Sequence, residues 1–152
     1  MRMGKVLLIA ILLLFSCAQI NVRQSSEPLI VMQRTACYGQ CPQYKVSVYR
    51  NGTISYEGKL FVDKIGCFSA TIPLNKVKKI KSVLEELDFF ILDSLYKAPM
   101  TDIPSVITEV VINNKKHKVI DEYKGPKELK NLYYLIDSIT DSVSDWTDCV
   151  NE

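Results

Sequence analysis

The sequence predicts one α+β domain over residues 28–149, with an antiparallel sheet and two helices packed on one of its faces. Two observations lead to this prediction. Short apolar runs with a period of two, separated by turn residues, are typical of strands, and two longer segments whose apolar residues recur every three or four positions are typical of helices. In chain order these segments give four strands, a helix, two strands and a second helix.

The N-terminal segment precedes that domain and has the layout of a secretory signal. Arg2 and Lys5 are followed by an apolar run from Val6 to Phe15, which is too short to cross a bilayer because a spanning helix needs roughly 20 residues. Residues Leu14–Cys17 resemble the lipobox of bacterial lipoproteins, in which the cysteine is acylated and becomes the mature N-terminus. The alternative is cleavage after Ala18, which would release a soluble protein.

We therefore expect a signal peptide at residues 1–16, lipidation at Cys17 and a flexible polar tether at 17–27. Such a protein is anchored in the cell envelope and faces the periplasm or the outside. The signal contains two of the 19 basic residues and no acidic one, so the remaining basic residues balance the 17 acidic residues. A neutral domain is not expected to bind nucleic acid, and its membrane contact is expected through the acyl chains rather than through charge.

The elements of the domain follow from periodicity. Strands are expected at 29–34, 44–50, 53–61 and 67–72, followed by a helix at 74–87, strands at 105–112 and 117–123, and a helix at 126–146. Pro73 suits the start of the first helix, since the N–H that proline lacks has no partner there. In the last helix, apolar residues from Leu129 to Trp146 recur at spacings of three and four.

The first hairpin surrounds Asn51-Gly52, the strongest short-range hairpin signal. We expect a three-residue loop that starts at Arg50, with Gly52 in the left-handed conformation. This loop gives the pairs Val48–Ile54, Val46–Tyr56 and Lys45–Glu57. A two-residue loop would set the same valines opposite polar residues, and a slip of one residue moves every side chain to the other face. For the second hairpin, around residues 113–116, several loop lengths pair the apolar residues about equally well, so its register stays open.

Four of the five cysteines remain if Cys17 carries the lipid: Cys37, Cys41, Cys67 and Cys149. An even number in an exported domain favours disulfides, and four cysteines allow three connectivities. Cys37 and Cys41 are close enough to bridge if the residues between them turn tightly, which would leave Cys67 to Cys149. The spacing alone does not decide the pairing.

The same cysteines allow a second interpretation. Residues Cys37–Pro42 have the C-x-x-x-C-P spacing of copper-handling assembly proteins, and Cys37, Cys41 and His117 would then be the metal ligands. Those proteins have a thioredoxin-like fold, which the strand order here does not match. A thiol-disulfide function would use the same cysteine pair. His117 itself lies in a basic segment and is expected in a solvated loop. No catalytic motif is present, so we expect a non-catalytic domain without a cofactor.

The last predicted helix carries Asp137, Asp141 and Asp145 at intervals of four. Like charges at this spacing repel, and carboxylates near a helix C-terminus oppose the helix dipole. We expect lysines of the first helix, packed alongside, to compensate them.

The run from Arg34 to Tyr44 resembles an uncharacterised bacterial family of envelope domains with the motif R-x-x-C-[FY]-G-x-C-P-x-Y. Further matching elements are Tyr56-Glu57-Gly58, Thr101-Asp102-Ile103-Pro104 and Tyr123-x-Gly125-Pro126. The likeness covers about residues 29–146, and since that family has no assigned activity it implies an intact domain and no reaction. The pattern lacks counterparts of Cys67 and Cys149, which implies that these two cysteines bond to each other.

Outside plain apolar periodicity, the matching elements identify Arg34, Tyr38, Tyr44 and Asp102 as candidate binding residues for an unknown protein or small molecule. We expect Arg34 and Asp102 to form an ion pair across the Cys37–Cys41 loop. That pair is either a structural contact that fixes the loop or part of a binding site.

Overall fold

The structure, a computed structural model, describes residues 27–149. The predicted signal peptide at 1–16, the lipidation at Cys17 and the tether up to residue 26 lie outside the described residues. Within 27–149, no helix has the length and apolar character needed to cross a membrane.

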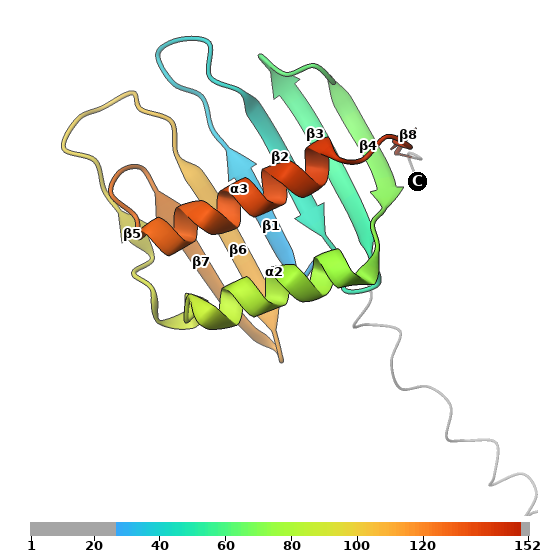
Figure 1. The fold of residues 1–152 in the computed structure, drawn as a ribbon. Helices are drawn as coiled ribbons and strands as arrows, with labels where there is room; N and C mark the ends of the chain where they lie inside the picture. Colours follow the sequence, from blue (N-terminus) through green and yellow to red (C-terminus); the bar gives the residue numbers. More distant parts are fainter. Residues whose placement is uncertain (1–26, 150–152) are drawn as a thin grey trace, which may run out of the picture.

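One eight-stranded sheet forms the centre of the domain (Figure 1). Its strands are β1 (Ile30–Arg34), β2 (Gln43–Val48), β3 (Thr53–Leu60), β4 (Gly66–Thr71), β5 (Leu95–Tyr96), β6 (Val106–Ile112), β7 (Lys115–Asp121) and β8 (Thr147–Asp148). They lie in the spatial order β5-β7-β6-β1-β2-β3-β4-β8. The other elements are α2 (Leu74–Glu86), the short 3-10 helix η2 (Phe89–Ile91) and α3 (Lys127–Asp141).

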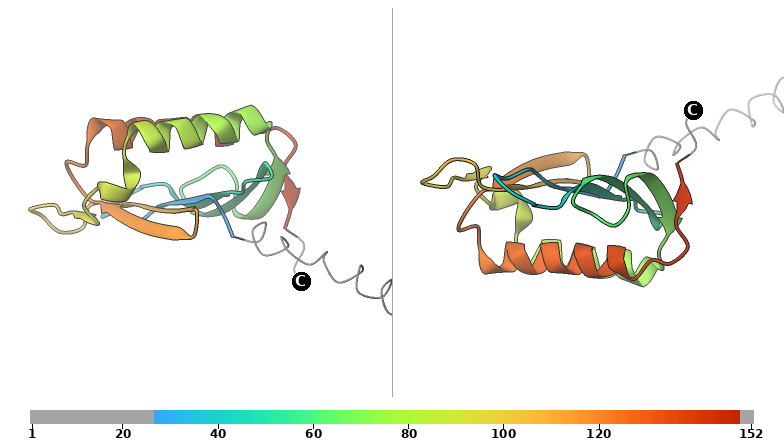
Figure 2. Two further views of the ribbon diagram at one scale, coloured as in Figure 1. Left: turned by 90° about the horizontal axis from the view of Figure 1, so that it is seen from below. Right: turned by 90° about the horizontal axis from the view of Figure 1, so that it is seen from above.

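Both long helices lie on the same side of the sheet (Figure 2). Their apolar stripes join the facing side chains of the strands in one core, to which β1 contributes Ile30 and Met32 and α3 contributes Leu129 and Leu132. Since apolar side chains alternate along the strands, the other face of the sheet carries polar and charged pairs, such as Lys45 with Glu57. The predicted α+β class is therefore confirmed.

The prediction of a purely antiparallel sheet is wrong, because β5 pairs with β7 in parallel. The chain must travel from the end of α2 to the start of β6 at the far end of the sheet. It does so along the outer edge of β7, in the direction in which β7 itself runs (Figure 1). The parallel pair is only two residues long, which is why no strand signal marks it in the sequence.

The predicted register of the first hairpin is confirmed. The observed partners are Val48 with Ile54, Val46 with Tyr56 and Lys45 with Glu57. Gly52 adopts the left-handed conformation with φ of 91°. The second hairpin uses a two-residue loop, since Ile112 pairs with Lys115. Its two loop residues, Asn113 and Asn114, have φ of 51° and 60°, as a type I′ turn requires and as asparagine tolerates.

Helix α3 ends earlier than predicted, at Asp141 rather than near Trp146. From Ser142 the chain leaves the helix and crosses to the outer edge of β4, where β8 pairs with it. Val143 and Trp146 still pack against the core, but from a segment without regular secondary structure. Their apolar spacing continues that of the helix, so periodicity alone could not locate the helix end.

Candidate functional site

Three side chains meet where α3 crosses the centre of the sheet. Arg34 of β1 and Tyr44 of β2 are cross-strand partners on the face that the helices cover, and Asp137 projects from α3 above them. The Arg34 guanidinium donates to Asp137 Oδ2 over 2.6 Å and to the Tyr44 hydroxyl over 2.7 Å. The Tyr44 hydroxyl in turn donates to Asp137 Oδ1 over 2.5 Å. The three groups therefore close a ring of charge-assisted hydrogen bonds.

This ring corrects the predicted ion pair, because Arg34 pairs with Asp137 and not with Asp102. Asp102 lies in the neighbouring loop with its side chain exposed, and its backbone carbonyl accepts a hydrogen bond of 3.2 Å from the Tyr38 N–H. The Tyr38 side chain is 94% exposed. Of the four candidate residues, the structure thus brings Arg34 and Tyr44 together, and it leaves Tyr38 and Asp102 in adjoining loops.

The expected compensation of the aspartate series is wrong as well. Asp137 is balanced by Arg34 of the sheet, and within residues 27–149 no lysine of α2 forms a salt bridge with Asp137 or Asp141. Asp145 lies beyond the end of α3. A carboxylate placed against the helix dipole was the signal in the sequence that Asp137 has a special partner, but periodicity could not name that partner.

The contacts within the ring raise the pKa values of both Arg34 and Tyr44. Burial lowers the pKa of Arg34, but the Asp137 carboxylate and the Tyr44 hydroxyl outweigh this and raise it above its ordinary value. Burial, followed by the proximity of Asp137, raises the pKa of the Tyr44 hydroxyl well above its ordinary value. The ring thus keeps Tyr44 protonated and Arg34 charged.

Two clefts of about 320 Å³ each flank the ring. The first, called the aromatic cleft here, has an aromatic and charged lining of Tyr44, Tyr56, Phe61, Asp63, Lys64, Asp137, Asp141 and Trp146. The Tyr44 and Tyr56 rings stack with centroids 5.6 Å apart, and the Tyr56 and Trp146 rings lie 5.9 Å apart. Burial, and then the nearby carboxylates of Asp63 and Asp141, raise the pKa of Tyr56. Aromatic faces and negative charge therefore share this space.

A close backbone approach positions the outer wall of the aromatic cleft. The loop between β3 and β4, which carries Phe61 and Asp63, folds back over Gly58. A Cβ atom on Gly58 would lie 1.8 Å from the carbonyl oxygen of Lys64. Only glycine fits there, which gives a physical reason for the glycine of the Tyr56-Glu57-Gly58 element.

The second cleft, called the basic cleft here, lies on the other side of the ring. Its polar and aromatic lining consists of Arg34, Asp121, Glu122, Tyr123, Lys124, Lys130, Tyr133 and Tyr134. Burial, and then Asp121, raise the pKa of Tyr133. The hydroxyls of Tyr133 and Thr108 are buried and have no hydrogen-bond partner within the described residues.

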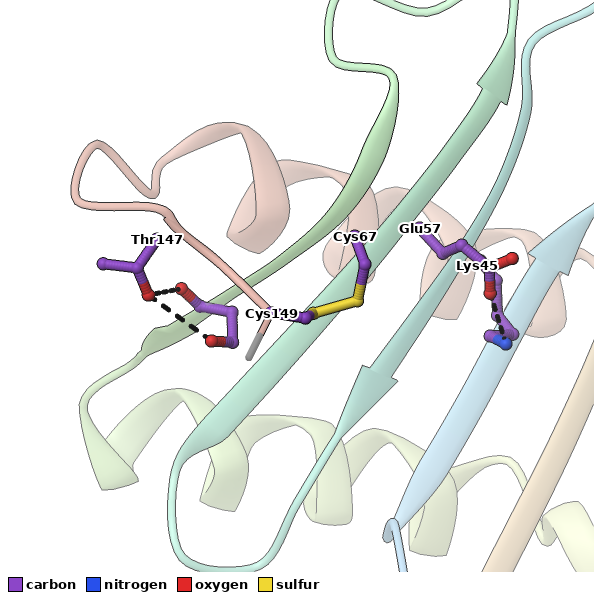
Figure 3. Close-up of a disulfide and its surroundings, with 6 residues drawn as sticks. Lys45, Glu57, Cys67, Thr147 and Cys149 are labelled. Carbon is purple, nitrogen blue, oxygen red and sulfur yellow. Dashed lines mark hydrogen bonds and ion pairs between the residues drawn. A yellow bond between two sulfur atoms is a disulfide. The ribbon is translucent and has the colours of Figure 1, made fainter. Parts of the chain in front are cut away.

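Both predicted disulfides are present in the structure. Cys37 and Cys41 are joined with Cα atoms 5.7 Å apart, and Cys67 and Cys149 with Cα atoms 5.3 Å apart. The second bond lies beside the Lys45–Glu57 pair, on the face of the sheet away from the helices (Figure 3). It holds the segment after α3 to β4, and this segment includes Trp146 of the aromatic cleft.

The expected solvated loop around His117 is wrong, since His117 belongs to β7 and is half-buried. Its Nε2 atom lies 3.0 Å from the Leu92 carbonyl oxygen, and its ring packs 5.7 Å from the Phe89 ring. Through Val110 it is level with Ile30 at the start of β1, whereas the Cys37–Cys41 loop follows the end of that strand. The alternative metal site of Cys37, Cys41 and His117 is therefore contradicted. Among residues 27–149, no group of three or more potential ligands could hold a metal ion.

Comparison with known proteins identifies one matching family. Its model, described as Domain of unknown function (DUF6438), matches residues 28–140. The matched span includes the whole ring, and Trp146 and Cys149 follow it. No curated protein matches this chain.

Proposed function

The chain belongs to the DUF6438 family of unknown function, and we propose that it is a non-catalytic binding domain that takes an organic cation in the aromatic cleft. The observation that carries the proposal is the combination of Tyr56, Phe61 and Trp146 with two exposed carboxylates, Asp63 and Asp141. Within the described residues, neither carboxylate is in a salt bridge. Aromatic faces attract cations, by about 0.5–2 kcal/mol per contact depending on exposure.

The position of the cleft within the domain supports a binding function. It is built by loops at the end of the sheet opposite to the turns at 50–52 and 113–114 (Figure 1). The described chain begins at the turn end, where the Glu27 carbonyl oxygen accepts a hydrogen bond of 3.1 Å from Arg50. A ligand site at the opposite end would face away from whatever precedes residue 27.

Trp146 provides the test, because it is the only tryptophan of the chain and lines the cleft. We expect choline to change the fluorescence of the full-length protein in detergent in a saturable manner, and its uncharged isostere 3,3-dimethylbutanol to bind at least about threefold more weakly. Asp63→Asn and Asp141→Asn should each weaken choline binding by roughly threefold. The matched control is Glu85→Gln, which neutralises an exposed carboxylate of α2. This variant should leave choline binding unchanged.

Equal binding of choline and the isostere would show that charge does not matter and would overturn the cation assignment. The absence of any saturable fluorescence change would remove the aromatic cleft as a site for such cations. Loss of choline binding in Glu85→Gln would indicate a general charge effect instead of a local site.

The location of the protein is proposed from the sequence. The pattern up to Cys17 supports a lipid anchor in the cell envelope, with membrane contact through the acyl chains and no binding of nucleic acid. Cys17→Ser should abolish membrane association, and mass spectrometry of the mature N-terminus should find an acylated Cys17. A mature chain that begins at Gln19 without acyl mass would disprove the anchor.

A thiol-disulfide activity of Cys37 and Cys41 is the competing function. Both residues are half-buried and bonded to each other in a loop. For a non-catalytic domain, free-thiol titration of the folded protein should find both disulfides intact and slow to exchange with dithiol reductants. Rapid and reversible reduction of the Cys37–Cys41 bond alone would favour the redox function.

A further inference from the structure

The basic cleft contains acidic and basic residues, and both of its carboxylates accept hydrogen bonds from backbone N–H groups. Asp121 is 6% exposed and accepts a hydrogen bond of 3.0 Å from the Gly125 N–H. Glu122 accepts a hydrogen bond of 3.0 Å from the Ala98 N–H through its carboxylate. A backbone N–H group therefore occupies part of the hydrogen-bonding capacity of each carboxylate, so less of that capacity is open to a ligand.

The basic side chains of the cleft keep N–H donors that have no hydrogen-bond partner within the described residues. Arg34 uses its Nε and one terminal nitrogen in the ring, and its other terminal nitrogen donates no hydrogen bond within the described residues. Lys130 is exposed on the first half of α3 and forms no salt bridge in this part of the chain. Lys124 forms a cation–π interaction with the Tyr123 ring, with its Nζ atom 5.2 Å from the centroid, and no salt bridge within residues 27–149. Three positive groups thus face one cavity.

The helix dipole adds to this positive field. Lys130 lies in the N-terminal half of α3, which is the positive end of the helix, and no side chain caps that end. A cation at this position opposes the dipole and lowers helix stability. An anion in the cleft would be attracted by the helix end and by the lysine together.

The loop before α3 is held in a strained conformation. Lys124 has φ of 61°, in the left-handed region that long side chains rarely adopt. The next residue must be small, because a Cβ on Gly125 would lie 2.5 Å from the Asp121 carboxylate. Asp121 therefore clamps the loop through Gly125 and keeps Lys124 at the rim of the cleft, which is the kind of local strain found at ligand sites.

From these contacts we infer that the basic cleft is a second binding site, independent of the aromatic cleft, for an oxyanion group of the carboxylate or phosphate class. Arg34 binds the anion from the floor through its free nitrogen, and Lys124 and Lys130 bind it from the rim. The exposed rings of Tyr123 and Tyr134 beside them provide contact area for the rest of the ligand.

Nuclear magnetic resonance titration of the full-length protein in detergent tests this inference. Inorganic phosphate and acetate would be the separate probes, and sodium chloride at equal ionic strength would be the reference. We expect saturable shifts at the backbone amides of residues 122–130 and at Arg34 Nε, with a dissociation constant on the order of millimolar. The probe that binds more tightly identifies the class of oxyanion.

Variants of the rim locate the site without touching the ring. Replacing both lysines, as Lys124→Ala with Lys130→Ala, should weaken binding of the tighter probe by roughly tenfold. The matched control replaces two exposed lysines of α2, as Lys76→Ala with Lys79→Ala, and should leave the affinity unchanged. It removes the same net charge from the same side of the sheet.

The variant Lys124→Gly distinguishes a loss of anion binding from a loss of stability. Because glycine adopts positive φ at no steric cost, this variant should keep or raise the melting temperature while it weakens anion binding. The inference is overturned if sodium chloride produces the same shifts as the probes, or if the α2 control loses as much affinity as the rim variant. It is also overturned if neither anion gives a saturable shift, whatever the result with choline.

Discussion

The two clefts beside the Arg34–Asp137 pair have about the same volume, and each contains both acidic and basic residues, but their carboxylates have different partners. In the aromatic cleft, Asp63 and Asp141 are exposed and in no salt bridge of the described chain, and the single lysine of the lining, Lys64, does not balance both carboxylates. In the basic cleft, Asp121 and Glu122 accept hydrogen bonds from backbone N–H groups, whereas Lys124 and Lys130 form no salt bridge within the described residues. The hydrogen-bond and ion-pair partners of the charged groups therefore decide the character of each cleft, rather than the number of charges.

The clefts also differ in how they are held in place. The aromatic cleft depends on Trp146, which lies beyond α3 and is fixed by the Cys67–Cys149 bond. The basic cleft depends on the short connection between β7 and α3, which Asp121 clamps through one hydrogen bond. The ring of Arg34, Tyr44 and Asp137 separates them and belongs to both.

The largest expected effect comes from breaking the aromatic cleft alone. Replacing Cys67 and Cys149 by serine removes a bond across 82 residues, and the chain-entropy relation gives a loss of about 4–5 kcal/mol in the free energy of unfolding. The same change at Cys37 and Cys41, which are four residues apart, should cost only about 2 kcal/mol. Urea denaturation measures both values. Anion binding should survive the first change in the protein that remains folded, and similar losses for both pairs would contradict the prediction.

A smaller loss is expected from the ring, which both clefts share. Asp137→Ala leaves Arg34 without its ion-pair partner and the Tyr44 hydroxyl without its acceptor. Since the two charged side chains are 26% and 24% exposed, we expect a cost of about 2–3 kcal/mol, less than for a fully buried pair. Thermal and urea unfolding check this value. Asp141→Ala, one turn further along α3, is the control and should change stability by less than about 0.5 kcal/mol.

The smallest expected effect concerns the Tyr44 hydroxyl. Tyr44→Phe removes one donor and one acceptor from the ring and should cost about 1 kcal/mol near neutral pH. Because the pKa of Tyr44 is raised in the folded protein, its contribution is complete below the unfolded pKa of about 10 and is lost as the pH rises further. The stability of the natural chain should therefore fall above that pH, and more steeply than that of Tyr44→Phe. Equal slopes in urea denaturation at pH 9 to 11 would refute the coupling.

Local sequence determined the six longer strands and their faces. The alternation from Tyr44 to Val48, together with Asn51-Gly52, predicts the observed register of the first hairpin because only one loop length places the apolar residues on one face. Spacings of three and four likewise predict the buried stripe of α3. In the second hairpin the alternation was equally compatible with several loops. The left-handed Asn113 and Asn114 settle it in the folded protein.

The tertiary structure alone decided the site. Arg34 and Asp137 are 103 positions apart, and they meet because α3 crosses the sheet above the end of β1, an arrangement that no local period encodes. The same holds for the parallel β5–β7 pair and for the early end of α3, where the chain leaves the helix to reach β4. Apolar spacing specifies which face of an element is buried, but it does not specify which element covers that face. The partners of the charged residues at the rim of the core, and with them the two clefts, therefore follow only from the packing of the elements.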